Sequence, residues 1–321
     1  MKRIASLFLS LMLAISMIPT LAYAESETAA VPQLAVTVKG AGLYAEWTAP
    51  DGAESYEIYR SYQSDSKWTL LKKGITDCSY QDMSVASGKK AYYKVRALKA
   101  DGSFSDYSEA ASGIIYRVWI ETGHGRGDDG RWDPGCMWDK YQEAKLMIPI
   151  CRSMAKYLRE KGVYVYTDAY DGNNKNLNWT LKKVKENNVS VLVNVHCDYK
   201  KAPKGTMPLY RYSDQKALAK CLNNGVHKYV KMKNRGLKRR KDLKTLNRTR
   251  GTCVACLFET GSIKKDNKLL RTKYDAYGKG LAKGVCDYLG IQWKFKLQDV
   301  MFYLRGLSPE SKLCLRILLL I

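Results

Sequence analysis

A change in hydrophobic periodicity near residue 115 constrains the fold of this chain of 321 residues more than any other feature. Residues 32–115 alternate apolar and polar side chains in short runs separated by turn residues, and they show no helical period. Short strands at this spacing are typical of a β-sandwich. From residue 116 onward, apolar strand-like runs alternate with segments whose apolar residues recur at helical spacing. We therefore predict a multidomain chain, with an all-β sandwich over residues 32–115 and an α/β domain over residues 116–293.

The alternation of strands and helices in the second region predicts a largely parallel sheet flanked by helices. The predicted strands cover residues 114–120, 163–169, 189–198 and 252–261, and the predicted helices cover residues 143–162, 178–188, 213–232 and 273–290. In sheets of this kind, binding sites form beyond the carboxyl ends of the strands. Polar residues at those ends are therefore the first candidates for function.

The N-terminus has the pattern of an export signal. Residues 1–24 begin with two cations, continue as an apolar stretch and end in Ala-Tyr-Ala, so we expect a signal peptide cleaved before Glu25. An uncleaved membrane anchor is the alternative. No later run reaches the ~18 apolar residues of a transmembrane helix. We expect a secreted or cell-wall-associated protein, and the apolar tail at residues 294–321 receives no predicted role.

The chain is strongly basic, with 54 Lys and Arg against 31 Asp and Glu and a net charge of +23. Nucleic acid is the usual partner of such a chain, but export makes it a poor candidate. Residues 235–251 hold eight of the basic residues and no aromatic ones, which also disfavours nucleic acid. This segment is either a solvated loop or a cationic rim that attracts anionic wall polymers.

The nine cysteines do not have the number or spacing of a small disulfide scaffold. Cys253 and Cys256 have CxxC spacing, but they lie in a predicted strand, where the two side chains point to opposite faces. We therefore expect buried structural thiols there, and neither a zinc knuckle nor a redox pair.

Four polar residues lie at the predicted edge of the sheet. His124 and His196 follow two strands, Glu259 follows a third, and Glu143 begins a helix. Two imidazoles and a carboxylate suit a catalytic zinc ion, which takes three protein ligands and leaves one position open. The glycines beside His124 let the backbone approach closely. A histidine at a strand end is also common as an ordinary surface residue, and we interpret His227, within a helix, in that way.

The motifs of this region, taken in order, resemble those of the zinc-dependent N-acetylmuramoyl-L-alanine amidases of the amidase type 3 family. The resemblance covers residues 114–290 and is carried by a Gly-His-Gly at 123–125, an Asp-Pro-Gly at 133–135, a glutamate that begins a long helix at 143, a strand that ends in a histidine at 196, and the sequence Leu-Phe-Glu-Thr-Gly-Ser-Ile at 257–263.

The resemblance implies a function and a role for each matched residue. His124, Glu143 and His196 match the family's zinc ligands, and Glu259 matches its catalytic glutamate. The implied cofactor is Zn²⁺, and the implied reaction is hydrolysis of the amide between N-acetylmuramic acid and L-alanine in peptidoglycan. Asp139 is a rival third ligand, because the loop before Glu143 looks longer than usual. No nucleophilic side chain is needed.

Residues 32–115 resemble a fibronectin type III domain, a module that carries no chemistry and acts as a spacer or a binding unit. Trp47 and Tyr93 would fill its core. Two alternatives remain for the chain as a whole. One is a non-catalytic peptidoglycan-binding protein on an amidase-like scaffold, and the other is a zinc peptidase that acts on the stem peptide. The chain also departs from the family pattern, since Glu121 and Thr122 stand where an aspartate and a proline are usual.

Overall fold

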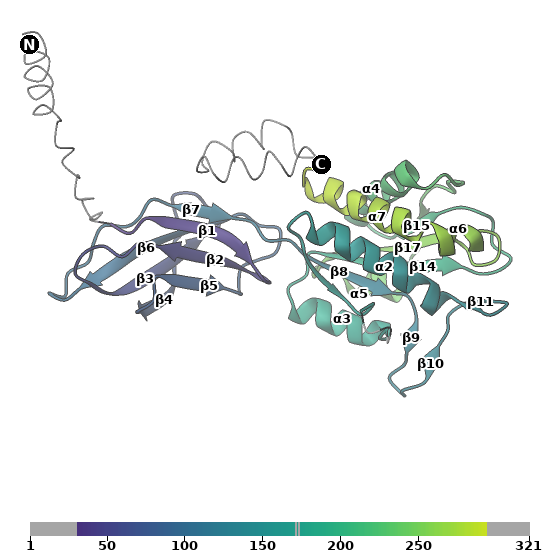
Figure 1. The fold of residues 1–321 in the computed structure, drawn as a ribbon, viewed down its shortest axis with the longest axis horizontal. Helices are drawn as coiled ribbons and strands as arrows, with labels where there is room; N and C mark the ends of the chain where they lie inside the picture. The colour runs from purple at the N-terminus through teal and green to yellow at the C-terminus, as the bar shows by residue number, and fades with distance from the viewer. Residues whose placement is uncertain (1–30, 171, 173, 294–321) are drawn as a thin grey trace, which may run out of the picture.

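The computed structural model describes residues 31–170, 172 and 174–293 (Figure 1). The predicted signal peptide at 1–24 and the tail at 294–321 lie outside the described residues. Among the helices that are described, none combines the length and the apolar character needed to cross a bilayer.

The N-terminal region consists of two antiparallel sheets that share one core. The first has the strand order β1–β2–β5 and the second the order β4–β3–β6–β7. Their bounds are β1 Leu34–Lys39, β2 Gly42–Trp47, β3 Ala53–Ser61, β4 Thr69–Ile75, β5 Ser79–Asp82, β6 Ala91–Lys99 and β7 Ala111–Gly113. Trp47 and Tyr93 are both buried in this core, as predicted.

The C-terminal region is built on one six-stranded sheet with the order β13–β8–β14–β17–β15–β16. Its strands are β8 Arg117–Thr122, β13 Tyr164–Thr167, β14 Val191–Asp198, β15 Met207–Tyr210, β16 Lys238–Arg239 and β17 Val254–Ser262. The sequence predicted a largely parallel sheet, and this is corrected to a mixed one, because β15 runs antiparallel to β17. Two small ribbons beside the sheet, β9 (Gly125–Arg126) with β10 (Trp132–Asp133) and β11 (Met137–Trp138) with β12 (Tyr141–Gln142), are antiparallel as well.

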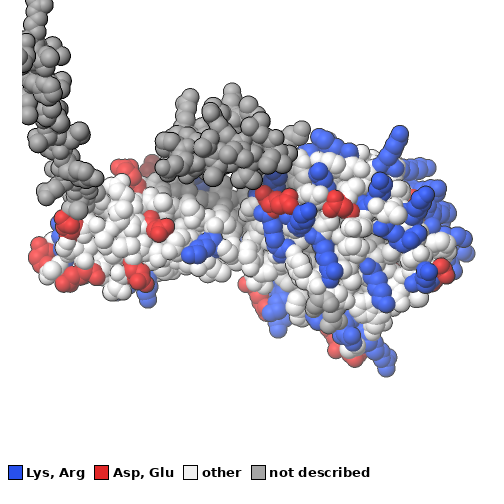
Figure 2. Space-filling view, in the orientation of Figure 1, with Lys and Arg blue, Asp and Glu red and all other residues white. Residues whose placement is uncertain are grey.

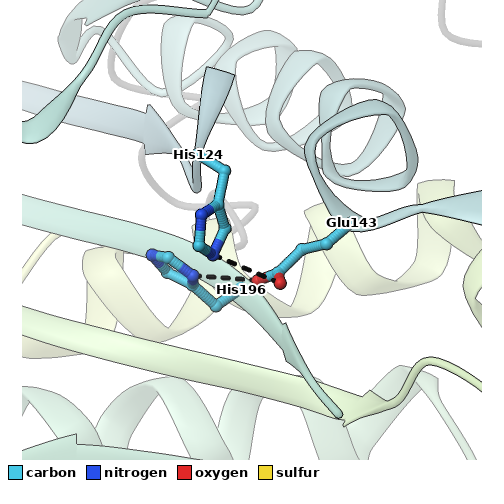
Figure 3. Close-up of side chains that lie close together, drawn as sticks. All are labelled: His124, Glu143 and His196. Atoms are coloured by element: carbon cyan, nitrogen blue, oxygen red, sulfur yellow. Dashed lines mark hydrogen bonds and ion pairs between the residues drawn. The ribbon is translucent and has the colours of Figure 1, made fainter. Parts of the chain in front are cut away.

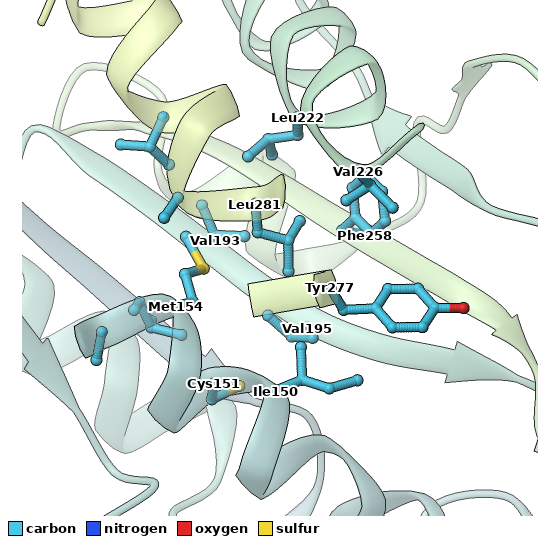
Figure 4. Close-up of a cluster of buried hydrophobic side chains, with 14 of the residues drawn as sticks. Ile150, Cys151, Met154, Val193, Val195, Leu222, Val226, Phe258, Tyr277 and Leu281 are labelled. Carbon is cyan, nitrogen blue, oxygen red and sulfur yellow. The ribbon is translucent and has the colours of Figure 1, made fainter. Parts of the chain in front are cut away.

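Helices cover both faces of this sheet, and each face has its own core. The first face packs against α2 (Glu143–Arg159), α4 (Ser213–Tyr229) and α7 (Tyr274–Leu289), in the cluster that Figure 4 shows. The second packs against α3 (Leu177–Glu186) and α5 (Lys244–Arg248). A short helix, α6 (Asn267–Thr272), precedes α7. The helices predicted from periodicity are confirmed, with ends displaced by a few residues.

Successive side chains of the central strands point alternately to the two layers of helices. On β14, Val193 and Val195 belong to the first core and Leu192 to the second. Cys253 and Cys256 divide in the same way and are both buried free thiols, as predicted. His196 therefore projects from the α3 and α5 face, at the carboxyl end of the strand.

A buried arginine joins the two regions. The side chain of Arg117, the first residue of β8, is 2% exposed and donates hydrogen bonds to three backbone carbonyls of the N-terminal region. These acceptors are Ala41 at 2.8 Å, Val85 at 2.9 Å and Met83 at 3.3 Å. The guanidinium thus satisfies carbonyls in the β1–β2 turn and in the segment after β5, and it fixes them against the amino end of β8, which is the end of the strand opposite His124.

We expect Arg117→Met to lower the free energy of unfolding by about 3 kcal/mol, because it leaves buried carbonyls without a donor. It should also separate the unfolding of the two regions into two calorimetric transitions. The control is Arg131→Met, which removes a side chain that is 90% exposed and should change stability by less than about 0.5 kcal/mol. A single, unshifted transition in Arg117→Met would contradict this role.

Candidate metal centre

His124 lies in a tight turn between Gly123 and Gly125, where a side chain on either neighbour would clash. It follows β8 and has a φ of 64°, in the left-handed region. A Cβ atom added at Gly123 would lie 2.5 Å from the ring of His196, and one added at Gly125 would lie 2.4 Å from the carbonyl oxygen of Asn174. A Cβ at Gly135 would lie 2.5 Å from the ring of His124 itself. The glycines therefore let the two imidazoles and the chain around them come together.

Glu143 is the first residue of α2, and its side chain is 3% exposed. Each carboxylate oxygen accepts a hydrogen bond from a backbone N–H. Cys136 donates to Oε2 and Cys197 donates to Oε1, both at 3.0 Å. These two peptide groups hold the carboxylate in one orientation.

The two imidazoles face this carboxylate from neighbouring positions (Figure 3). His124 Nε2 lies 3.3 Å from Glu143 Oε2, and His196 Nδ1 lies 2.9 Å from Glu143 Oε1. One ligand atom from each of the three residues lies within 4.8 Å of the others. The Oδ2 atom of Asp133 lies 2.8 Å from His124 Nδ1, within hydrogen-bond distance. The other ring nitrogen, Nε2, therefore faces the centre. A carboxylate behind a ligating histidine is the usual outer partner of a metal site, so the residues present fit a zinc ion.

Glu259 is the fourth candidate residue, and it lies on β17 beside the strand that carries His196. It pairs in register with His196 across the parallel strands β17 and β14, so the two side chains project from the same face. Its Oε2 atom is buried and has no hydrogen-bond partner among the described residues. Burial raises the pKa of Glu259 to about 7, and the carboxylates of Glu143 and Asp198 contribute to this rise. Glu259 can therefore exchange a proton near neutral pH.

A cavity of about 250 Å³ opens beside both histidines. Its walls include Asn194, Thr245 and Lys244, and Glu121 lies among its lining residues. Glu121 is 3% exposed, and burial followed by repulsion from Asp168 raises its pKa well above the ordinary range. The cavity beside the centre is therefore lined by polar groups, among them a buried carboxyl whose pKa is raised.

The structure brings together His124, Glu143 and His196, and it leaves the other candidates outside this set. Asp139, the rival third ligand, is exposed in the turn between β11 and β12. His227 lies half-buried on α4, where its Nε2 is 2.8 Å from Thr206 Oγ1.

Two features of the centre were not predicted from the sequence. Asp133 was noted only as part of a motif, although its spacing from His124 placed it within reach. The backbone N–H groups of Cys136 and Cys197 had no sequence signal, because every residue except proline carries one.

Comparison with a protein-family model points to the C-terminal region, which contains the candidate metal centre. Residues 118–290 match the family described as N-acetylmuramoyl-L-alanine amidase, a span that includes all four strand-end residues. The amidase AmiC2 of Nostoc punctiforme is 25% identical over 55% of this chain and 97% of its own, with a TM-score of 0.48. The catalytic domain of CwlV, an amidase from Bacillus (Paenibacillus) polymyxa var. colistinus, is 20% identical over 56% of this chain and 100% of its own, with a TM-score of 0.49.

A third solved structure is similar to a smaller part of the chain. An Fn3-like protein from Clostridium thermocellum is 32% identical over 27% of this chain and 92% of its own, with a TM-score of 0.24. No curated protein matches the chain.

We expect the stability of protein stripped of metal by a chelator to fall as the pH rises from about 6.5 to 9. Burial by itself lowers the pKa of His124. The carboxylates of Glu143 and Asp133 outweigh this effect and raise the pKa to about 9. Because the folded state then binds a proton that the unfolded state releases, the stabilisation is complete below pH ~6.5 and is lost through pH ~9. Urea unfolding should show a loss of about 2 kcal/mol, which Asp133→Asn should reduce. An equal loss in both proteins would contradict the role of this pair.

Proposed function

Because the chain belongs to the N-acetylmuramoyl-L-alanine amidase family, we propose that it hydrolyses the amide between N-acetylmuramic acid and L-alanine with a zinc ion held by His124, Glu143 and His196. The observation that carries the proposal is the convergence of these three side chains within the matched span. The donor set is two imidazole nitrogens and one carboxylate, which is typical of catalytic zinc sites with an open position.

The residues around the proposed ion have separate tasks. When bound, zinc supplies a Lewis acid that activates water and polarises the scissile carbonyl. Asp133 holds His124 in the tautomer that presents Nε2, and the backbone N–H groups of Cys136 and Cys197 hold Glu143. Glu259 takes a proton from the attacking water and passes it to the departing amine. A carboxyl with a pKa of about 7 is suited to both halves of this transfer at neutral pH.

The alternatives lack a supporting observation. A non-catalytic binding protein would be favoured by a missing ligand or base, whereas all four positions hold competent residues. A stem-peptide peptidase would need a cation free to bind a terminal carboxylate. Arg235, whose positive charge acts on Glu259, is instead paired with Asp198 at 2.9 Å. The match to the amidase family favours the amide of the muramoyl linkage as the proposed substrate.

We propose the cell wall as the place of action and anionic wall polymer as a partner of the surface. Residues 114–293 contain 37 Lys and Arg against 17 Asp and Glu, whereas residues 31–113 contain 10 of each. Figure 2 shows cations spread over the C-terminal region and a mixture of charges on the N-terminal one. The positive field is thus concentrated around the proposed catalytic unit, where it raises the local concentration of a polyanionic substrate. The N-terminal sheets are proposed to be a fibronectin type III-like module.

Metal content distinguishes the proposed ligand set from its rival. We expect His196→Ala to lose most of the zinc, while the parent protein and Asp139→Ala retain about one ion per chain. Elemental analysis after gel filtration in metal-free buffer provides the measurement. Loss of zinc from Asp139→Ala but not from His196→Ala would replace the proposed set.

Activity distinguishes the proposed base from a ligand. Glu259→Gln should keep its zinc and lower kcat by about 100-fold or more, because the amide cannot accept the proton. The assay incubates the protein with purified peptidoglycan and measures newly exposed L-alanine amino termini. The matched control Glu186→Gln changes an exposed glutamate on α3 and should be fully active. Full activity of Glu259→Gln would remove Glu259 from the mechanism.

A further inference from the structure

Two cysteines lie against the carboxylate that organises the centre. The sulfur atoms of Cys136 and Cys197 are 3.9 Å apart, although 61 residues separate them in the chain. Cys136 is half-buried in the segment before β11, and Cys197 is buried on β14. Because consecutive residues of a strand project to opposite faces, Cys197 faces the α2 side while His196 faces the cavity.

We propose that Cys136 and Cys197 are a disulfide-forming site that covalently ties the two segments holding Glu143. A disulfide bond length is about 2.05 Å, so the sulfurs must approach by roughly 1.9 Å. This approach requires rotation of the half-buried Cys136 side chain about its Cα–Cβ bond. The proposal rests on these contacts alone and does not depend on the amidase activity or on zinc.

The surroundings of the sulfurs favour a disulfide over a metal–thiolate group. The same sulfurs and Glu143 are close enough together to hold a cation. However, Cys136 Sγ lies 3.3 Å from the carbonyl oxygen of Cys197 and 3.6 Å from that of Asp198. These carbonyl oxygens accept from the thiol form, whereas a metal would hold both sulfurs as thiolates at the same time; disulfide exchange uses one thiolate in each step. A cation at the sulfurs would also share the carboxylate of Glu143 with the set formed by His124 and His196.

The bond would act on the centre through the backbone. Cys136 and Cys197 are the two residues whose N–H groups donate to the two oxygens of Glu143. Linking their side chains fixes the two donors relative to each other. The carboxylate between them then loses the freedom that separation of the segments would allow, and the chain loses conformational freedom in the unfolded state.

The reaction requires an oxidant of the disulfide class. The thiolate of Cys136, the more accessible of the two, attacks a small-molecule disulfide and releases one small thiol. The thiolate of Cys197 then attacks the resulting mixed disulfide and releases the second. Overall, the protein loses two hydrogen atoms and forms one S–S bond, while the small-molecule disulfide is reduced to two thiols.

The test uses the full chain and oxidised glutathione, applied to the folded protein and during refolding. We expect a mass loss of two hydrogen atoms, and a proteolytic fragment pair that joins Cys136 to Cys197 and separates on reduction. The oxidised protein should melt roughly 5–10 °C above the reduced one. Cys136→Ser and Cys197→Ser should lose both effects. The control Cys221→Ser, which changes a half-buried thiol on α4, should retain them.

Three results would overturn the proposal. One is a linked fragment that joins other cysteines, and another is complete alkylation of both thiols after refolding with oxidised glutathione. The third is protection of the thiols by Cd²⁺ with a sulfur-to-metal absorption band, which would assign the pair to a cation. Should the serine variants fail to fold, the fragment map of the parent still decides. None of these readouts changes if the chain lacks zinc or amidase activity.

Discussion

The hydrogen bonds from two peptide groups to the carboxylate of Glu143 are the interaction on which the centre depends. A carboxylate that is 3% exposed is costly to bury unless its oxygens are paired, and here each oxygen has a backbone donor and an imidazole. The donors come from the segment before β11 and from β14, and the carboxylate comes from α2. The side chain of Glu143 therefore holds three parts of the chain in one arrangement, and Cys197 lies 54 residues away from it in sequence.

The sequence predicted those features of the fold that depend on periodicity or on position in a strand. The helix from Glu143 and the strand that ends near His196 follow from apolar spacing, and adjacent parallel strands bring their carboxyl ends to one edge. The same reasoning missed β15, since a four-residue strand containing Pro208 shows no period and runs against its neighbour. Its preference for Glu143 over Asp139 rested on the register of the resembling family, because both residues lie near the start of a helix.

Side chains of the centre project from both faces of the sheet. The proton-exchanging residues lie on one face and the Cys197 thiol lies on the other. His196 lines the cavity, and Glu259 projects from the same face of the sheet, where its buried carboxyl can exchange protons near neutral pH. Cys197 projects from the other face of the same strand, against α2. Neighbouring residues of one strand thus lie in different environments, and Glu143 contacts both the histidines and the peptide groups of the two cysteines.

The position of Arg117 has a consequence for how the chain works on a cross-linked network. It anchors the N-terminal region at the amino end of β8, while the cavity opens beyond the carboxyl end of the same strand, about 20 Å away for six residues. The N-terminal region therefore cannot line the cavity or share in recognising the bond that is cut. If this region binds the wall, the arrangement keeps a fixed distance between the bound wall strand and the cavity. Cleavage would then fall on a neighbouring strand of the mesh.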